Sequence, residues 1–253
     1  MFKLAVVKLT SCSGCVNQLM LALLLNEDIR SQYKVVYFKE LGAVDHEEYD
    51  VAFVEGSVST AEQEKELENV RSRSRFLVAL GTCAVQGGVQ SLRAGENIDA
   101  VKSTVYPEPS LVEVYPEPKP VPEVVRVDYV VPGCPVNGEP LHAFLRKYAV
   151  GGLPFNFNES VCSECKRAGL ECIMVSRGIP CLGPITHASC GALCPSTGRG
   201  CYGCTGMRTH DLNPRNLHEF ENVVKKLGAP ENYVQVLLRA YGSRSYKLVH
   251  GGV

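Results

Sequence analysis

The sequence predicts an α/β protein, in which a flavodoxin-like, doubly wound parallel sheet is followed by an irregular cysteine-rich domain with C-terminal helices. Two observations support this division. Apolar runs of strand length alternate with helical patterns through the first 150 residues, which is typical of right-handed strand–helix–strand crossovers. Beyond Gly151-Gly152 the alternation stops, and eight of the 12 cysteines lie between Cys162 and Cys204. We therefore expect one domain over residues 1–150 and a second over 151–253.

Five apolar runs have the length and composition of buried strands. They are residues 3–9, 34–38, 51–54, 76–80 and 127–131. About five strands joined by helices in some 150 residues match the size of a flavodoxin-like domain.

Two helices of this domain are marked by apolar residues at helical spacing. The inward face of the first is expected to consist of Val16, Leu19, Met20, Leu23 and Leu24. The inward face of the second, which follows the last strand, is expected to consist of Leu141, Phe144, Leu145 and Tyr148.

Two further segments are expected at the surface. Thr60 and Gln63 form a capping box for a helix that runs to about Arg73 and carries mostly Glu, Lys and Arg, so we expect only a solvated face there. Residues 101–124 hold six of the 15 prolines, which predicts an extended insertion with no helix.

The last 40 or so residues predict two helices and a frayed end. Asn213-Pro214 starts the first helix and Gly228 stops it. Its expected inward residues are Leu217, Phe220, Val223, Val224 and Leu227. Pro230 opens the second, whose expected inward residues are Tyr233, Val236, Leu237 and Ala240. Residues 250–253 should fray.

The composition argues against several classes of function. Hydrophobic residues make up 45% and charged residues 21%, as in an ordinary globular protein. A formal net charge of -1 provides no positive field for nucleic acid. No apolar run reaches the roughly 18 residues that a membrane span needs. The N-terminus has no secretory layout, so we expect a cytoplasmic protein whose thiols stay reduced, which argues against a framework of six disulfides.

Four cysteines of the first half each follow a predicted strand. They are Cys12, Cys15, Cys83 and Cys134. Loops after parallel strands open on the carboxyl edge of the sheet, where doubly wound proteins bind ligands, so these thiols should converge. The first turn contains neither the dinucleotide fingerprint nor a P-loop, so no nucleotide site is expected there. Four thiolates are the ligand count of one cubane iron–sulfur cluster.

The other eight cysteines divide by proximity in the sequence into two further sets of four. One set is Cys162, Cys165, Cys172 and Cys181, and the other is Cys190, Cys194, Cys201 and Cys204. This grouping is the simplest one and other groupings remain open. Zinc is the main alternative metal, because two C-x2-C pairs can frame a zinc ribbon. The single cysteines at strand ends favour iron–sulfur clusters over zinc.

Several motifs in order carry a resemblance to a known family. They are Cys12-Ser-Gly-Cys15, Val54-Glu55-Gly56-Ser57, Gly81-Thr-Cys83-Ala84-Val-Gln-Gly-Gly88, Gly133-Cys134-Pro135, Pro180-Cys181-Leu-Gly-Pro184 and Gly200-Cys201-Tyr-Gly-Cys204. With these motifs the chain resembles the small subunit of cytoplasmic (group 3) [NiFe] hydrogenases, and above all the archaeal sulfhydrogenase delta subunits. The resemblance covers nearly the whole chain.

The resemblance implies three [4Fe–4S] clusters, and each cluster takes the name of the set of cysteines that would hold it. The proximal set is Cys12, Cys15, Cys83 and Cys134, the medial set is Cys190, Cys194, Cys201 and Cys204, and the distal set is Cys162, Cys165, Cys172 and Cys181. Glu55 matches a position beside the proximal cluster in that family. The alternative interpretation is a loop carboxylate whose hydrogen bonds are satisfied by its neighbours. Cys162 stands where exported relatives have a His. His187 and His210 are close to the sets in sequence and are expected to be packed or solvent-facing.

The resemblance also implies partners. The nickel–iron centre would lie in a large subunit, and FAD and NAD(P) would be bound by flavin-containing and ferredoxin-like subunits. The chain would then relay electrons from H2 oxidation and have no activity alone. Two alternatives are a zinc-stabilised interaction module on a flavodoxin-like domain and a small-subunit relative in another respiratory complex.

Overall fold

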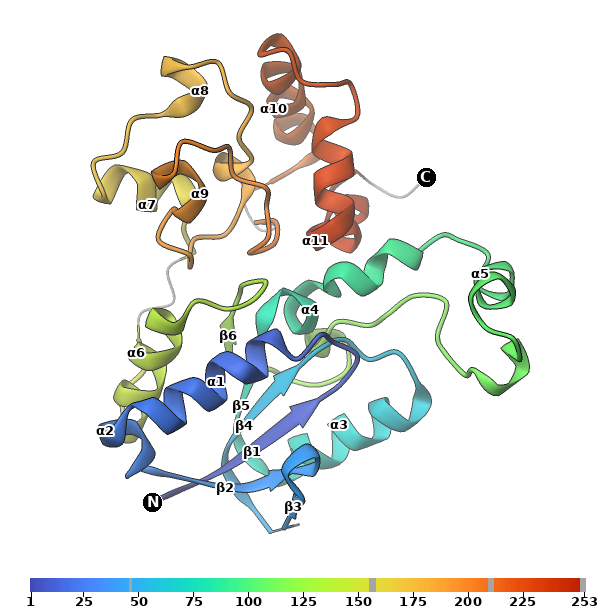
Figure 1. Cartoon of the computed structure of the whole chain (residues 1–253), viewed down its shortest axis with the longest axis vertical. Coiled ribbons are helices and arrows are strands. Elements are labelled where there is room, and N and C mark those ends of the chain that lie inside the picture. Colours follow the sequence, from blue (N-terminus) through green and yellow to red (C-terminus); the bar gives the residue numbers. More distant parts are fainter. Residues whose placement is uncertain (46, 155–157, 209–211, 251–253) are drawn as a thin grey trace.

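The computed structural model of the chain describes residues 1–45, 47–154, 158–208 and 212–250 (Figure 1). Its strands are β1 (Phe2–Lys8), β2 (Tyr33–Phe38), β3 (Ala43–Val44), β4 (Tyr49–Glu55), β5 (Ser74–Leu80) and β6 (Tyr129–Val131). Its α-helices are α1 (Gly14–Leu25), α2 (Glu27–Arg30), α3 (Ala61–Arg73), α4 (Gly81–Gln86), α5 (Ile98–Val105), α6 (Gly138–Ala149), α7 (Val161–Arg167), α8 (Ile173–Ser176), α9 (Leu193–Ser196), α10 (Pro214–Lys226) and α11 (Tyr233–His250). Short 3-10 turns are η1 (Lys39–Leu41), η2 (Gly88–Arg93), η3 (Pro109–Leu111), η4 (Val121–Glu123) and η5 (Gly183–Ile185).

The sheet has the order β3-β2-β1-β4-β5-β6. The strands β2, β1, β4, β5 and β6 pair in parallel, so the predicted doubly wound fold is confirmed. Without β3 the order is that of flavodoxin-like sheets. β3 pairs antiparallel with β2 through Tyr37–Val44 and Phe38–Ala43, and it was not predicted. Two residues are too short to produce a periodic signal in a sequence.

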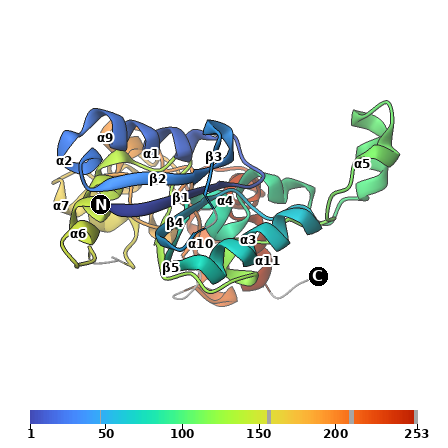
Figure 2. The same cartoon turned by 90° about the horizontal axis from the view of Figure 1, so that it is seen from below.

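Helices cover both faces of the sheet, with α1 and α6 on one side and α3 on the other (Figure 2). Alternate residues of β1 point to opposite faces, with Leu4 and Val6 in one core and Ala5 and Val7 in the other. Phe144 of α6 packs edge-on against Phe53 of β4, with ring centroids 5.6 Å apart.

The prediction for the inward face of α1 was wrong at one end. Val16, Leu19 and Leu23 are buried, but Leu24 is 66% exposed. Residues 19 and 23 share one helical stripe, whereas residue 24 belongs to the neighbouring stripe at the margin of the core.

Helix α3 begins as predicted, because the Thr60 side chain accepts a hydrogen bond from the Gln63 backbone N–H at 3.2 Å. The Gln63 side chain bonds the backbone N–H of Ser59 at 2.8 Å and not that of Thr60. The expectation of only a solvated face was incomplete, since Leu67 and Val70 are buried against the sheet.

The prediction of a helix-free insertion was wrong. Helix α5 extends into residues 101–124, and η3 and η4 lie there too. Asn97 caps α5 by accepting hydrogen bonds from the backbone N–H groups of Asp99 and Ala100. The helix ends at Val105, before the first proline at 107, so the prolines limit it without preventing it. Figure 2 shows this segment projecting from the body of the molecule.

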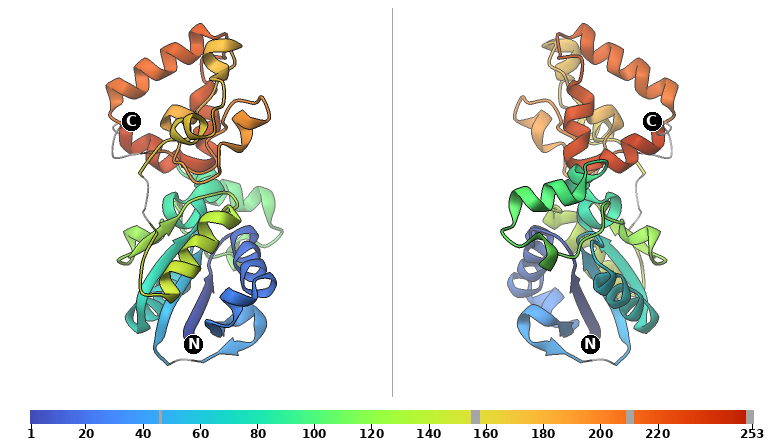
Figure 3. Two further views of the ribbon diagram at one scale, coloured as in Figure 1. Left: turned by 90° about the vertical axis from the view of Figure 1, so that its left-hand side faces the viewer. Right: turned by 90° about the vertical axis from the view of Figure 1, so that its right-hand side faces the viewer.

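The C-terminal helices lie beyond the carboxyl ends of the strands, with the short helices α7 to α9 beside them (Figures 1 and 3). Helix α10 starts at Pro214 with Asn213 as its cap, as predicted, and α11 starts at Tyr233 and not at Pro230. The buried residues of this region include Leu217, Val224, Val234 and Leu238.

Two predicted inward residues of the C-terminal helices are exposed, Val223 by 47% and Val236 by 54%. Each helix is covered on one narrow stripe only, so the outer edge of the predicted face remains in water. Helix α11 packs against α4 and η2 of the sheet-containing part. None of the helices in the described residues is long and apolar enough to cross a membrane.

Candidate functional site: three sets of thiols

The proximal set of cysteines lies where the sequence predicted it, at the carboxyl edge of the sheet (Figure 1). Cys12 precedes α1 and Cys15 lies in its first turn, both after β1. Cys83 lies in α4 after β5, and Cys134 follows β6. Cys15 is buried and Cys12 is exposed, so the set reaches from the core to the surface.

The proximal thiols lie close to one another, since Cys15 Sγ is 3.9 Å from the carbonyl of Gly133, the residue before Cys134. Burial, above all, raises the pKa of Cys15 to about 12, and the nearby Cys83 and Cys134 add to the rise. Burial likewise raises the pKa of Cys83 to about 11, with further contributions from Cys134 and Cys12. The pKa of Cys134 is raised by burial and then by Cys12. Each of the four sulfurs therefore lies within electrostatic range of at least two others.

Glycines allow the backbone to approach the proximal sulfurs closely. A Cβ at Gly81 would overlap Cys15 Sγ, and one at Gly88 would lie 2.6 Å from Cys83 Sγ. Gly81 also has a φ of +86°, in the left-handed region that disfavours side chains. Gly81 and Gly88 are thus required by the space around the thiols.

Glu55 is the last residue of β4 and is a buried carboxylate facing the start of α1, only 2% exposed. Its oxygens accept hydrogen bonds from the backbone N–H groups of Cys15 at 3.1 Å and Val16 at 3.2 Å. Burial raises the pKa of Glu55, and these two N–H donors act in the opposite direction. Glu55 therefore holds the first turn of α1, and with it Cys15, in place.

The distal set of cysteines lies on α7 and the segments around α8. Burial first, and then Cys181 and Cys172, raise the pKa of Cys162. Burial raises the pKa of Cys165 to about 11, with contributions from Cys162, Cys181 and Cys172. The structure thus brings these four thiols together.

The medial set of cysteines surrounds α9 and the turn that follows it. Burial raises the pKa of Cys204 to about 11, with contributions from Cys190 and Cys194. Burial raises the pKa of Cys201 to about 12, with contributions from Cys181 and Cys204. Cys201 therefore lies within electrostatic range of the distal set as well as of its own.

The three sets form a continuous series. Cys134 of the proximal set contributes to the raised pKa of Cys204 of the medial set. Cys181 of the distal set contributes to that of Cys201. The medial set therefore has a neighbouring thiol in each of the other two sets.

Two side chains that the sequence analysis did not single out join the proximal and medial sets. The buried hydroxyl of Thr82 donates to the Cys204 carbonyl at 2.7 Å and accepts from the Gly133 N–H at 3.2 Å. The Gln86 amide bonds both the carbonyl of Met207, at 2.6 Å, and its N–H, at 2.9 Å. Both lie in α4 on either side of Cys83, and their place in the Gly81–Gly88 motif is the signal that the sequence offers.

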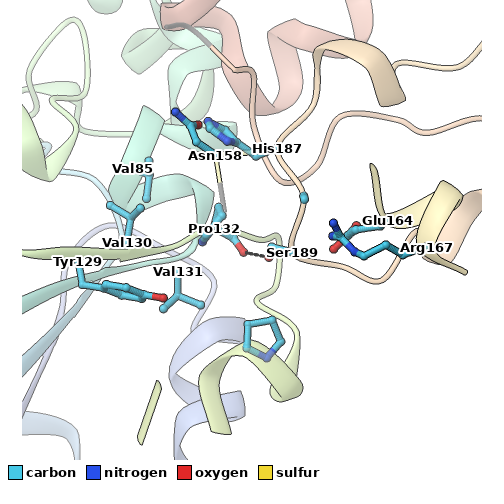
Figure 4. Close-up of a pocket in the computed structure, with 12 residues that line it drawn as sticks. Val85, Tyr129, Val130, Val131, Pro132, Asn158, Glu164, Arg167, His187 and Ser189 are labelled. Atoms are coloured by element: carbon cyan, nitrogen blue, oxygen red, sulfur yellow. Dashed lines mark hydrogen bonds between the residues drawn. The ribbon is translucent and has the colours of Figure 1, made fainter. Parts of the chain in front are cut away.

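A cavity of about 470 Å³ lies between β6, α7 and the segment 187–189 (Figure 4). Its polar lining includes Tyr129, Asn158, Glu164, Arg167, His187 and Ser189. Ser189 closes one side by donating a hydrogen bond to the Pro132 carbonyl at 2.6 Å. His187 is half-buried on this wall, as expected for a packed side chain, and His210 lies outside the described residues.

The chemistry of the three sets fits iron–sulfur clusters. Within the described ranges, no three His, Cys, Asp or Glu side chains are close enough together to hold a single metal ion. The fit rests on the ligand count, since each set supplies the four thiolates that one cubane cluster needs. The buried hydroxyls of Ser11 and Ser57, near the proximal set, also have no hydrogen-bond partner in the described part of the chain. A buried group with acceptor sulfurs would satisfy them.

Comparison with known proteins agrees with this architecture. A family described as NADH ubiquinone oxidoreductase, 20 Kd subunit, matches residues 12–148. The sulfhydrogenase 2 subunit delta of Pyrococcus furiosus is 39% identical over 205 residues, covering 81% of this chain and 86% of its own. A subunit of the F420-non-reducing hydrogenase vhu of Methanococcus voltae is 31% identical over 244 residues, covering 83% of this chain and 84% of its own.

A solved structure also resembles this chain. It is a chain of an NAD+-reducing [NiFe]-hydrogenase in the H2-reduced state, with a TM-score of 0.55 and 26% identity over 62% of this chain and 96% of that one. A doubly wound domain with a cysteine-rich extension thus places the protein in the class of hydrogenase subunits. The chain belongs to the NADH ubiquinone oxidoreductase 20 Kd subunit family, as a hydrogenase small subunit.

Proposed function

We propose that this chain is the electron-transfer small subunit of a cytoplasmic [NiFe] hydrogenase. In this role it carries electrons between a large subunit that oxidises H2 reversibly and a partner that binds flavin. Membership of the hydrogenase small-subunit family supports the role, and no residue of the chain is assigned to H2 cleavage itself.

The proposal assigns one [4Fe–4S] cluster to each set of cysteines, because four thiolates are the ligand count of a cubane. Residues 1–150 would form a domain that holds the proximal cluster, and residues 151–253 a domain that holds the other two. When bound, such clusters supply one-electron carriers.

The observation that carries this proposal is the serial order of the three sets. Thr82, the neighbour of Cys83, donates a hydrogen bond to the Cys204 carbonyl at 2.7 Å, and the Cys201 N–H donates to Cys181 Sγ at 3.1 Å. A zinc-stabilised module would need stable folds around each site but no contact between sites. A relay requires such contacts, because electrons pass only between carriers that are close together.

Residues next to the cysteines would tune the clusters or hold their ligands in place. Backbone N–H groups of Gly183 and Gly203 lie 3.4 Å from the sulfurs of Cys181 and Cys201. Hydrogen bonds to ligand sulfurs favour the more negative, reduced state and so raise the reduction potential. Glu55 anchors the helix turn that presents Cys15, as described above.

The partners follow from the family. We propose a large subunit that holds the nickel–iron centre, together with flavin-containing, NAD(P)-binding and ferredoxin-like subunits. The similarity to a chain of an NAD+-reducing [NiFe]-hydrogenase supports a nicotinamide as the terminal acceptor. The small subunit alone should have no activity.

Metal analysis of the anaerobically purified native complex tests the proposal. The small subunit should contribute about twelve irons, and its visible absorption should bleach on reduction with H2. Zinc in place of iron would instead indicate the interaction module. A full iron content without any H2-dependent reduction would indicate a small-subunit relative in another respiratory complex.

A further inference from the structure

Two turns of the same form meet at the boundary between the medial and distal sets. Each consists of a cysteine, one intervening residue and a glycine, namely Cys181–Gly183 and Cys201–Gly203. In both turns the glycine N–H lies 3.4 Å from the sulfur of the cysteine two residues earlier.

The two turns pair with each other through hydrogen bonds. The Leu182 N–H donates to the Cys201 carbonyl at 2.9 Å. The Cys201 N–H in turn donates to Cys181 Sγ at 3.1 Å. All three residues are at least 94% buried, so water does not separate the two turns. A ligand of one predicted cluster thus bonds the ligand sulfur of the other.

Gly200 makes this pairing sterically feasible. A Cβ at this position would collide with the Pro180 carbonyl oxygen, and would lie 3.4 Å from Cys181 Cα. The φ of Gly200 lies outside the left-handed region, so glycine is needed here for space and not for backbone conformation. Any side chain at position 200 would push the two turns apart.

We propose that the paired turns are the contact through which the medial and distal clusters exchange electrons, with Gly200 as the positioning residue. This inference rests on the proposed function. From Cys201 Sγ the route follows its Cβ, Cα and N–H and crosses a single hydrogen bond to Cys181 Sγ. With both clusters bound, one electron would pass from the reduced cluster, which would be oxidised, to the other, which would be reduced, and no atom would be transferred.

The pairing also sets the electrostatic environment of the distal cluster. Cys181 Sγ receives N–H groups from both Gly183 and Cys201. Because N–H donors stabilise the reduced form, removal of the Cys201 donor should shift the midpoint potential of the distal cluster to a more negative value.

The test uses the complete complex, purified anaerobically, with three variants. Gly200→Ala separates the turns. Gly183→Ala is a milder change, because its Cβ would lie 3.3 Å from Cys181 Sγ and require only a small shift. Gly152→Ala is the control, since its Cβ would be 3.6 Å from the Lys147 carbonyl, an ordinary contact. For each variant we would measure iron content, cluster potentials by redox-poised EPR, and the rate of distal-cluster reduction after rapid mixing with H2.

We expect Gly200→Ala with full iron to show slower distal-cluster reduction and a more negative distal potential, with the proximal potential unchanged. If Gly200→Ala does not retain its iron, Gly183→Ala becomes the decisive variant. It should shift the midpoint potential of the distal cluster and leave those of the other two clusters unchanged. Wild-type rates and potentials in the decisive variant would overturn the inference. So would loss of iron from both variants, since the glycines would then serve assembly. A wild-type complex without three iron clusters would instead refute the proposed function.

Discussion

Replacement of Thr82 by valine tests the junction between the two halves of the chain. Valine has nearly the same shape but lacks the hydroxyl that bonds the Cys204 carbonyl at 2.7 Å and the Gly133 N–H at 3.2 Å. Thr82 is 1% exposed, so water cannot replace these bonds. An unsatisfied buried polar group costs about 1–3 kcal/mol, and two groups are affected. We expect a loss of stability of roughly 2–5 kcal/mol, allowing for some relaxation.

The assay is urea unfolding of the anaerobic holoprotein, followed by circular dichroism because the chain has no tryptophan. Thr82→Ser retains the hydroxyl and should lie close to the wild type. Thr104→Val is the matched control, since the Thr104 hydroxyl bonds the Ala100 carbonyl on exposed α5 at 2.9 Å. Its effect should stay within about 0.5 kcal/mol. Equal urea midpoints for the Thr82→Val and Thr104→Val variants would refute the reasoning.

Two further predictions concern the proximal set and the insertion. Gly81→Ala should remove about four irons and leave the rest bound. Its Cβ would overlap Cys15 Sγ, and Gly81 has a positive φ that disfavours a side chain. Metal analysis of the variant measures the iron that remains. Lys119→Met should destabilise the protein by about 0.5 kcal/mol at neutral pH, because it breaks the 2.8 Å ion pair with Glu64 at the surface. Lys119, and then Tyr115, hold the pKa of Glu64 below its usual value. The stabilisation that Lys119 gives the wild type is therefore present above the ordinary glutamate pKa and is lost as the pH falls through the lowered pKa of Glu64. The difference in stability between the wild type and Lys119→Met should vanish over the same pH range.

Controls for these two variants come from the same regions. Gly138→Ala should retain all its iron, since its Cβ would be 3.7 Å from the His142 ring. Lys65→Met changes an exposed lysine on α3 and should have no such pH dependence. Iron loss from Gly138→Ala equal to that from Gly81→Ala would contradict the steric argument. A pH-independent effect of Lys119→Met would contradict the ion-pair argument.

Several elements were predictable because their signals are local. The apolar runs of β1, β4 and β5 are continuous because parallel strands are buried on both faces, and the helical patterns of α1 and α6 each match one core. The strand-end positions of Cys15, Cys83 and Cys134 follow from the same periodicity. Membership of a parallel sheet is enough to bring them to one edge.

Other features needed the folded chain. Helix α5 was missed because the prolines that follow it dominated the interpretation of the insertion. Val223 and Val236 were assigned to a buried face, but the width of that face depends on which elements cover α10 and α11. Periodicity gives the direction of an apolar stripe, whereas the extent of its burial is a property of the neighbours.

By itself the sequence determined the doubly wound sheet, the cysteine-rich extension and the family, because strand periodicity and ordered motifs are written along the chain. Only the tertiary structure showed the contacts that Thr82, Gln86 and Gly200 make between segments far apart in the sequence. Those contacts join residues up to about 120 positions apart. The physical reason is that hydrogen bonding and close approach depend on distance in space, which no local pattern of residues records.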